Sequence, residues 1–111
     1  MVKQQRESFR VEFPRNYYPT LLINDNKFDV FDASEFGVKF YRNKNSLYSV
    51  GDYLTASITF PDGELFSLKA NVVRTEALYI SIELLTPLPL RKIRAEHLYL
   101  IQSFSEKKSF Q

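Results

Sequence analysis

Two short patterns near the start of the chain carry the side chains best suited to chemistry. Arg6 and Arg10 stand four residues apart as RxxxR, and Asp32, Ser34 and Gly37 follow as DxSxxG. A guanidinium is a planar fork that can hold a phosphate through two parallel hydrogen bonds or lie flat on a purine ring. The first pattern is therefore typical of a site for a planar, anionic ligand.

The second pattern suits the donor-rich edge of the same kind of ligand. The Asp32 carboxylate can accept two N–H groups from one edge of a guanine, and the Ser34 hydroxyl can add a third contact. Gly37 allows a positive φ or a close approach of the backbone to a ligand. Each pattern alone also has a simple structural interpretation, as solubilising charges or as a turn. Together they predict a guanine nucleotide site.

The composition excludes several other kinds of site. The chain has no cysteine and a single histidine, His97, which excludes disulfides, thiolate metal sites, a cysteine nucleophile and multi-histidine metal sites. Ser34 has no histidine near it in sequence, and His97 falls on the apolar side of a predicted helix, where a packed role is typical. We therefore expect a domain that is not an enzyme and that needs no metal or cofactor.

Charge and hydropathy indicate one cytoplasmic domain over residues 1–111. A net charge of +2 is too small to favour wrapping of a nucleic acid or attachment to an anionic membrane. No run of about 18 apolar residues is present, so we expect no membrane insertion. The N-terminus also lacks the apolar core of a signal peptide.

Most of the chain alternates apolar and polar residues in short runs, a pattern typical of an antiparallel barrel or sandwich. Asn24, Asp25 and Asn26 give the strongest hairpin signal, because Asn and Asp tolerate the left-handed region. The DxSxxG pattern joins the third run to the fourth, which predicts that its polar groups lie at a barrel rim. The predicted strands are 10–13, 20–23, 27–31, 37–41, 53–60, 64–74 and 77–85.

The last part of the chain changes to a helical period. Pro87 and Pro89 precede it, and proline is tolerated at a helix start. The apolar positions with this spacing are Leu90, Ile93, His97, Leu100, Ile101 and Phe104. The polar residues off this stripe, predicted to form a solvated face, are Arg91, Lys92, Arg94 and Glu96. We expect one helix over about residues 89–104, before a polar tail over 105–111.

The whole arrangement resembles the PilZ domain, the bacterial receptor for the second messenger cyclic di-GMP, and in particular its stand-alone members. Besides the two patterns, the resemblance rests on residues 50–52 (VGD) before a long strand and 72–74 (VVR) closing the next. It also includes residues 88–93 (LPLRKI) leading into 96–101 (EHLYLI). The fold that it implies is mainly β, a six-stranded antiparallel barrel with a C-terminal α-helix.

The resemblance also implies roles for the two patterns. Arg6 and Arg10 would hold phosphates and stack on guanine, Asp32 and Ser34 would read a guanine edge, and Gly37 would let the loop close on cyclic di-GMP.

Two further positions are possible additional contacts. The family often has another arginine just before RxxxR, where this chain has Gln5, so the number of bound ligand molecules, one or a stacked pair, stays open. Arg74, at a predicted strand end, is the other candidate.

A receptor without catalysis must pass its signal to a partner. Residues 1–10 have little apolar anchoring of their own, so we expect a flexible N-terminal arm that the ligand orders against the barrel. The changed surface would then be read by an unidentified downstream protein.

Two other functions stay open. One is a PilZ-like protein-interaction module with little nucleotide binding, against which the complete set of motif residues argues. The other is a small β-barrel that binds single-stranded nucleic acid by stacking. Against it stand the absence of a basic stripe and the core positions predicted for Phe28, Phe40, Phe60 and Phe66.

Overall fold

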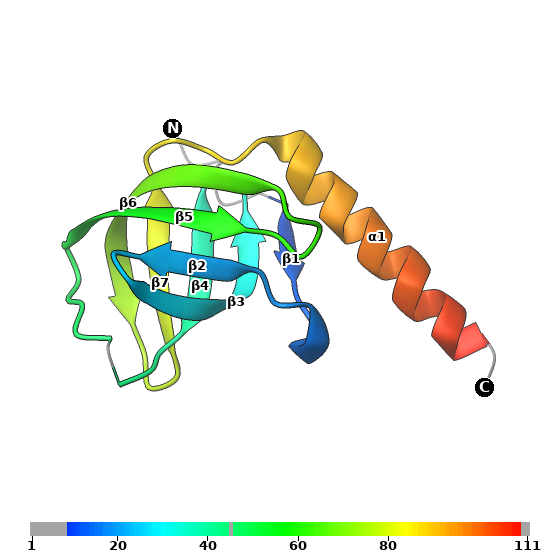
Figure 1. The fold of residues 1–111 in the computed structure, drawn as a ribbon, viewed down its shortest axis with the longest axis horizontal. Coiled ribbons are helices and arrows are strands. Elements are labelled where there is room, and N and C mark those ends of the chain that lie inside the picture. Colours follow the sequence, from blue (N-terminus) through cyan, green and yellow to red (C-terminus); the bar gives the residue numbers. More distant parts are fainter. Residues whose placement is uncertain (1–8, 45, 110–111) are drawn as a thin grey trace.

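The computed structural model describes residues 9–44 and 46–109 as an antiparallel barrel followed by a long helix (Figure 1). The strands are β1 (Arg10–Glu12), β2 (Thr20–Ile23), β3 (Asn26–Ser34), β4 (Gly37–Tyr41), β5 (Tyr53–Thr59), β6 (Leu65–Thr75) and β7 (Tyr79–Leu84). A short 3₁₀ helix, η2 (Arg15–Tyr17), follows β1, and the chain ends in α1 (Leu90–Ser109). Six strands close in the order β3-β2-β5-β6-β7-β4, with β4 returning to β3. The predicted six-stranded antiparallel barrel with a C-terminal helix is confirmed.

β1 is an additional strand that shares an edge of β3 with β2. Residues 26–29 of β3 pair with β2, residues 32–34 pair with β1, and the other edge of β3 pairs with β4. Pro14 and Pro19 bracket the connection between β1 and β2, and proline cannot donate to a ladder. β3 is therefore longer than the predicted strand over 27–31, because β1 extends its pairing to Ser34.

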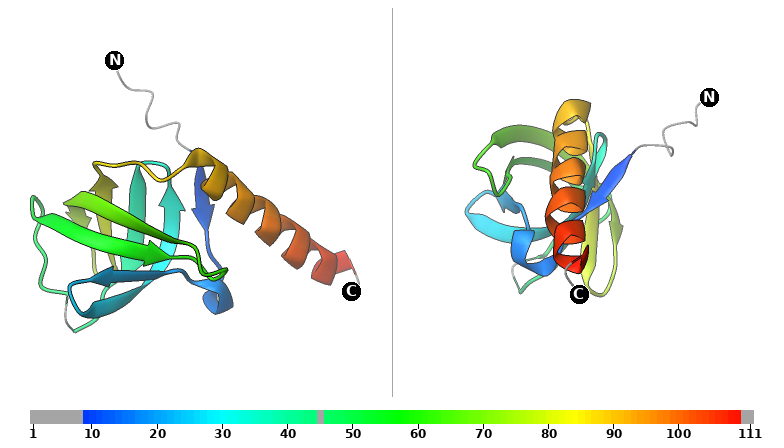
Figure 2. Two further views of the ribbon diagram at one scale, coloured as in Figure 1. Left: turned by 45° about the horizontal axis from the view of Figure 1, so that its top comes forward. Right: turned by 90° about the vertical axis from the view of Figure 1, so that its right-hand side faces the viewer.

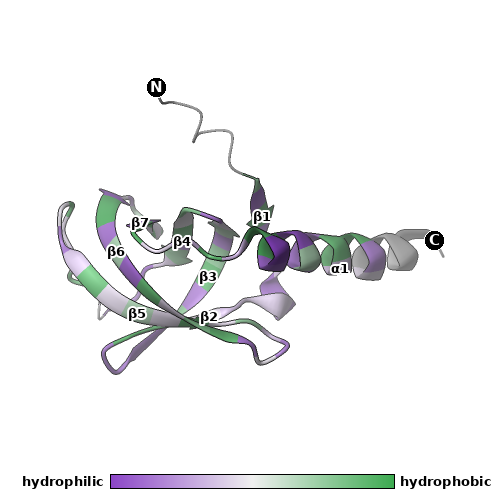
Figure 3. Ribbon diagram, turned by 90° about the horizontal axis from the view of Figure 1, so that it is seen from above, coloured by the Kyte–Doolittle hydropathy of each residue, from purple (hydrophilic) through white to green (hydrophobic). Residues whose placement is uncertain are grey.

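Hydrophobic and hydrophilic residues alternate along strands of the barrel (Figure 3), and the buried hydrophobic residues fill its interior. In β2, β4 and β7 the inward pairs are Leu21 and Ile23, Val38 and Phe40, and Ile80 and Ile82. Among the aromatics predicted for the core, Phe28, Phe40 and Phe60 are buried, while Phe66 is half-buried. Burial of such side chains is worth about 1.5–3 kcal/mol each, so this alternation supplies much of the driving force for barrel closure.

The C-terminal helix starts where the two prolines predict, but it is longer than the predicted helix. α1 begins at Leu90 and ends at Ser109, so the predicted end near residue 104 is wrong. The segment after 104 contains no glycine or proline, and its glutamate and lysines favour a helix. Ile93 and Leu100 are buried as predicted, whereas Ile101 is exposed. The ribbon of α1 extends past the strands at one end of the barrel (Figure 2).

The described part of the chain contains no helix with both the length and the apolar character needed to cross a membrane.

Candidate functional site

An ion pair joins the two sequence patterns. β1 lies beside β3 so that Arg10 is opposite Ser34 and Glu12 is opposite Asp32. The Arg10 Nη1 group donates a hydrogen bond to Asp32 Oδ1 at 2.6 Å. The Asp32 side chain is 8% exposed and that of Arg10 is 48% exposed. The carboxylate is thus held in the protein, while much of the guanidinium remains accessible to a ligand.

This pairing changes two expectations about local structure. Arg10 was expected in a flexible arm over residues 1–10, but its backbone pairs with Ser34 and it belongs to β1. Asp32 and Ser34 lie within β3 rather than in a loop, and only Glu35 and Phe36 connect β3 to β4. Gln5 and Arg6 lie outside the described residues.

Gly37 opens β4 without a left-handed backbone. The described glycines with positive φ are Gly51 and Gly63, so of the two roles considered for Gly37, a positive φ or a close backbone approach, the first does not apply. The Ser34 hydroxyl donates to the Gly37 carbonyl at 3.4 Å. A Cβ added at Gly37 would lie 3.6 Å from both Arg10 Nη2 and Ser34 Oγ, an ordinary contact. The missing side chain therefore leaves space beside the Arg10 guanidinium.

The ion pair borders a groove on the outer face of the barrel. Its volume is about 550 Å³, which is within the usual range of small-molecule sites, about 300–1,000 Å³. Of the predicted site residues, Arg10, Asp32, Gly37 and Arg74 line it. Ser34 does not line the groove, but its hydroxyl is hydrogen-bonded to the groove residue Gly37. The fold thus gathers residues from β1, β3, β4 and β6 around one space.

Sequence reasoning missed three polar groove residues, Lys39, Ser81 and Glu83. Lys39 could have been found, because it is two residues after Gly37 and therefore on the same face of β4. Ser81 and Glu83 could not, since their place opposite Lys39 and Gly37 depends on the pairing of β4 with β7.

Three aromatic rings that do not themselves line the groove form a cluster beside Lys39. Phe31, Tyr41 and Tyr79 pack on one another with ring centres 4.9–5.7 Å apart. The Lys39 Nζ lies 5.3 Å from the centre of the Tyr79 ring and 5.9 Å from that of Phe31. These rings hold the ammonium group at the margin of the groove through cation–π contacts.

The only histidine has a packing contact. His97 is half-buried on α1, and the ring of Phe9 meets it edge-on, with ring centres 4.7 Å apart. Phe9 directly precedes Arg10, so this contact ties the start of β1 to α1. Across residues 9–44 and 46–109, no group of His, Cys, Asp and Glu side chains is placed to hold a metal ion.

A second polar cluster lies where α1 meets the β5–β6 turn. Lys92 and Glu96 are buried, so the solvated face predicted for this part of α1 is wrong at both positions. The Lys92 ammonium contacts Asp62 at 2.6 Å, Glu96 at 2.9 Å and Glu64 at 3.0 Å. It also lies 4.9 Å from the centre of the Phe60 ring. The charge of Lys92 can be buried because the β5–β6 turn brings Asp62 and Glu64 to it as counter-ions. The helical period of the sequence does not reveal these partners.

Charge and burial shift the pKa values in this cluster. The hydrogen bond from Lys92 lowers the pKa of Asp62 and that of Glu64. Burial pulls the pKa of Lys92 down, but the hydrogen bonds to the three carboxylates outweigh it and hold that pKa above its usual value. Burial, followed by the charge of Glu96, raises the pKa of Tyr17 to about 12. Asp62, Glu64 and Lys92 therefore stay charged over the physiological pH range.

Known proteins resemble this chain in structure. No model of a protein family and no curated protein matches the sequence, whereas eight solved chains match the structure. One is the PilZ domain of YcgR from Escherichia coli with c-di-GMP, that is, cyclic di-GMP. It has 18% identity and a TM-score of 0.66, over 96% of this chain and 98% of that chain. Another is an uncharacterized Legionella protein, with 16% identity and a TM-score of 0.53, over 90% and 98% of the two chains.

The likeness to the Escherichia coli domain covers almost all of both chains, so it extends over the whole barrel. This chain has the fold of a PilZ domain.

Proposed function

We propose that this protein is a bacterial, cytoplasmic PilZ receptor for cyclic di-GMP that passes the signal to a partner protein. The observation that carries the proposal is the ion pair between Arg10 of RxxxR and Asp32 of DxSxxG at the edge of the groove. Two patterns separated by some twenty residues in sequence meet at 2.6 Å beside a space of suitable size. The solved PilZ domain that this chain resembles was determined with cyclic di-GMP, which supports the same ligand.

The residue roles follow from chemistry and position. Arg10, together with Arg6, binds phosphate and stacks on guanine, because a guanidinium can do both. Asp32 accepts the N–H groups of a guanine edge, and Ser34 adds a hydroxyl contact. Gly37 keeps the groove open beside the Arg10 guanidinium.

Calorimetric titration with cyclic di-GMP tests the proposal. Wild-type protein is expected to bind saturably. Arg10→Ala and Asp32→Ala each remove a charge-assisted contact worth about 1.5–3 kcal/mol, so each weakens binding about ten- to a hundredfold. Thermal unfolding followed by circular dichroism checks that both variants fold.

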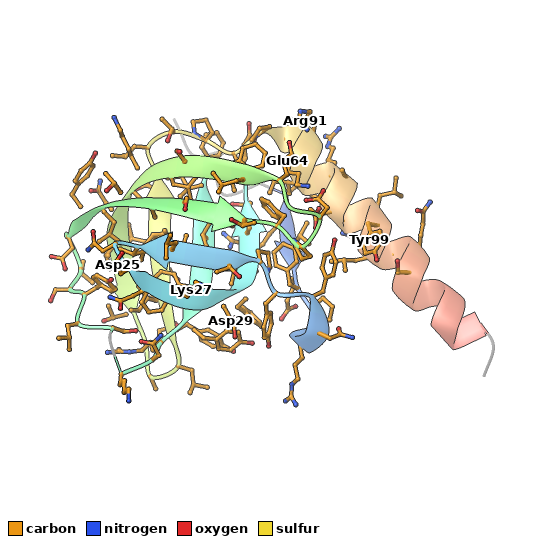
Figure 4. All side chains as sticks on the ribbon, in the orientation of Figure 1. Asp25, Lys27, Asp29, Glu64, Arg91 and Tyr99 are labelled. Atoms are coloured by element: carbon orange, nitrogen blue, oxygen red, sulfur yellow. The ribbon has the colours of Figure 1, made fainter. Side chains whose placement is uncertain are left out.

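Two matched controls come from the same residue types. Arg94 is exposed on α1, and Asp25 is exposed in the β2–β3 turn, at the end of the barrel far from α1 (Figure 4). Arg94→Ala and Asp25→Ala should keep the wild-type affinity. Unchanged affinity in both groove variants would contradict the site, and no binding by the wild type would favour a protein-interaction module.

Signal transmission is proposed to use the N-terminal arm. Capture of the ligand by Arg6 and Arg10 orders the residues that precede β1, and the contact of Phe9 with His97 provides a route from this segment to α1. The partner then reads the altered surface.

Hydrogen–deuterium exchange of residues 1–10 tests this route. Amide exchange there should slow when cyclic di-GMP is added, because the arginines become fixed on the ligand, and it should not slow for Asp25 in the remote turn. Exchange that is equally slow without ligand would rule out the ordering step while leaving the binding site intact.

A further inference from the structure

Lys39 is a groove residue that neither sequence pattern includes. It is half-buried on β4, and its ammonium group faces the rings of Phe31 and Tyr79. No carboxylate of a described residue lies within 4.0 Å of that ammonium group. By contrast, Arg10 pairs with Asp32 at 2.6 Å and Arg74 pairs with Glu76 at 3.5 Å. Among the described cations of the groove, Lys39 is the one without an acidic partner.

The strand register places Lys39 in a row with Asp32, Ser81 and Arg74. Lys39 is opposite Ser81 on β7, and Ser81 is opposite Arg74 on β6. A bulge in β6 between Val72 and Arg74 shifts the register, which turns both Val73 and Arg74 toward the groove. Adjacent strands lie about 4.8 Å apart, so Lys39 and Arg74 flank Ser81 across roughly 10 Å. Both long side chains can reach a group placed above Ser81.

Neighbouring rows of the groove differ in charge. In the row of Lys39, the carboxylate of Asp32 on β3 lies opposite Lys39 but is paired with Arg10. That row therefore has two cations, a hydroxyl and a carboxylate that already has its cation. In the row beside it, Gly37 is opposite the carboxylate of Glu83. A phosphate is attracted by the first and repelled by the second.

Lys39 is half-buried, and its ammonium group lies over two ring faces without a carboxylate partner among the described residues. An anionic group of the ligand would supply the missing partner. The Arg10–Asp32 pair lies at the edge formed by β1 and β3, whereas Lys39 and Arg74 lie on β4 and β6. The cations of the groove are therefore spread over β1, β4 and β6, with Asp32 of the ion pair directly opposite Lys39.

We infer that Lys39, together with Arg74, binds the second phosphate of a ligand whose first phosphate is held at Arg10. This inference rests on the proposed function, and it predicts that the groove prefers a cyclic dinucleotide, which carries two phosphates, over a nucleotide with one.

Calorimetric titration of wild type, Lys39→Met and Lys39→Arg with cyclic di-GMP tests the role of Lys39. Methionine keeps the unbranched side chain against the two rings but removes the charge, and arginine restores the charge. Lys39→Met should bind about tenfold more weakly, the loss expected for one charge-assisted contact, while Lys39→Arg should recover most of the affinity. The matched control is Lys69→Met, an exposed lysine on β6 that lines a different groove.

The outcomes separate this inference from the proposed function. If wild type and Lys39→Met bind with equal affinity, the second phosphate site is wrong and the receptor function stands. The same holds if Lys69→Met weakens binding as much as Lys39→Met, or if Lys39→Arg fails to recover affinity while melting at the wild-type temperature. If the wild type does not bind cyclic di-GMP, the proposed function and this inference are both wrong.

Discussion

Gly37 illustrates how one residue can matter for a ligand and not for the backbone. Its conformation is open to any residue, because it is not among the described glycines with positive φ. An added methyl group would touch Arg10 Nη2 and Ser34 Oγ at 3.6 Å. The glycine of DxSxxG therefore leaves space beside the Arg10 guanidinium and is not required for a left-handed turn.

We predict that Gly37→Ala separates stability from binding. Its free energy of unfolding should stay unchanged or rise by up to about 1 kcal/mol, since alanine restricts the unfolded chain. Its affinity for cyclic di-GMP should fall, because the methyl group fills the groove beside Arg10. Chemical denaturation and calorimetric titration measure the two effects.

Gly51→Ala is the matched control. Gly51 has a φ of +99° and open space around it, so alanine there is strained and should cost about 1 kcal/mol of stability without changing affinity. A Gly37→Ala variant that loses stability and keeps its affinity would contradict this account.

At the residue scale, the sequence identified the charged motif residues but not all of their neighbours. Arg10, Asp32 and Gly37 could be named because their types and spacing are unusual in combination. The position of Lys39 on the groove face could have been predicted from strand alternation. Ser81 and Glu83 depend on which strands pair, information that one sequence does not carry.

At the scale of elements, Lys92 fixes α1 to the barrel. Its ammonium group joins Glu96 of the helix to Asp62 and Glu64 near the β5–β6 turn. Arg91 adds an exposed ion pair with Glu64 at 3.4 Å, and Figure 4 shows these two side chains together at the start of α1. Tyr99 stacks on Tyr17 of η2, with ring centres 5.2 Å apart. These contacts position the helix in addition to its apolar stripe, which is anchored in the core through Ile93 and Leu100.

We predict that Lys92→Met lowers the free energy of unfolding by about 3 kcal/mol, because it leaves the buried Glu96 carboxylate without its cation. The double change Lys92→Met with Glu96→Met should recover part of this loss, since no unpaired charge remains. Arg94→Met, at an exposed position of the same helix, should change stability by less than about 0.5 kcal/mol. Urea denaturation measures all three.

The effect of Lys92 depends on pH. The carboxylates with lowered pKa values, Asp62 and Glu64, stabilise the fold above their usual pKa values of 3.8 and 4.5, and this is lost as pH falls through the lowered values. Lys92, with a raised pKa, stabilises the fold below its usual value of 10.5, and this is lost at higher pH. The stability difference between wild type and Lys92→Met should thus be greatest between these limits. A difference that is constant from acid to alkaline pH would refute the role of this charge network.

The helix also shows where sequence reasoning reached its limit. Pro87 and Pro89 indicate its start, whereas the polar composition of residues 105–111 predicts an end near residue 104, short of the observed end at Ser109. The helical period alone predicts a solvated position for Lys92 and Glu96, because Asp62 and Glu64, which pair with Lys92, lie on a turn distant in sequence. Local periodicity identifies a helix face, but the charges that the face meets depend on tertiary structure.

At the scale of the whole molecule, closure of the barrel creates the groove. β3 pairs with β1, β2 and β4, and β4 pairs onward with β7, which places the ion pair and Lys39 on neighbouring strands. The closed barrel could be predicted from strand alternation and from the resemblance to PilZ domains. The addition of β1 to β3, which brings Arg10 to Asp32, could not, because it joins residues more than twenty apart through backbone pairing alone.

The central claim is that cyclic di-GMP binds in this groove. The most direct measurement is a titration of ¹⁵N-labelled protein with cyclic di-GMP, followed by amide chemical shifts. The amides of Gly37, Lys39 and Ser81 should shift saturably, while those of Thr55 and Lys69, on the separate groove of β5 and β6, stay in place. A spectrum that does not change, or shifts confined to the separate groove of Thr55 and Lys69, would contradict the account.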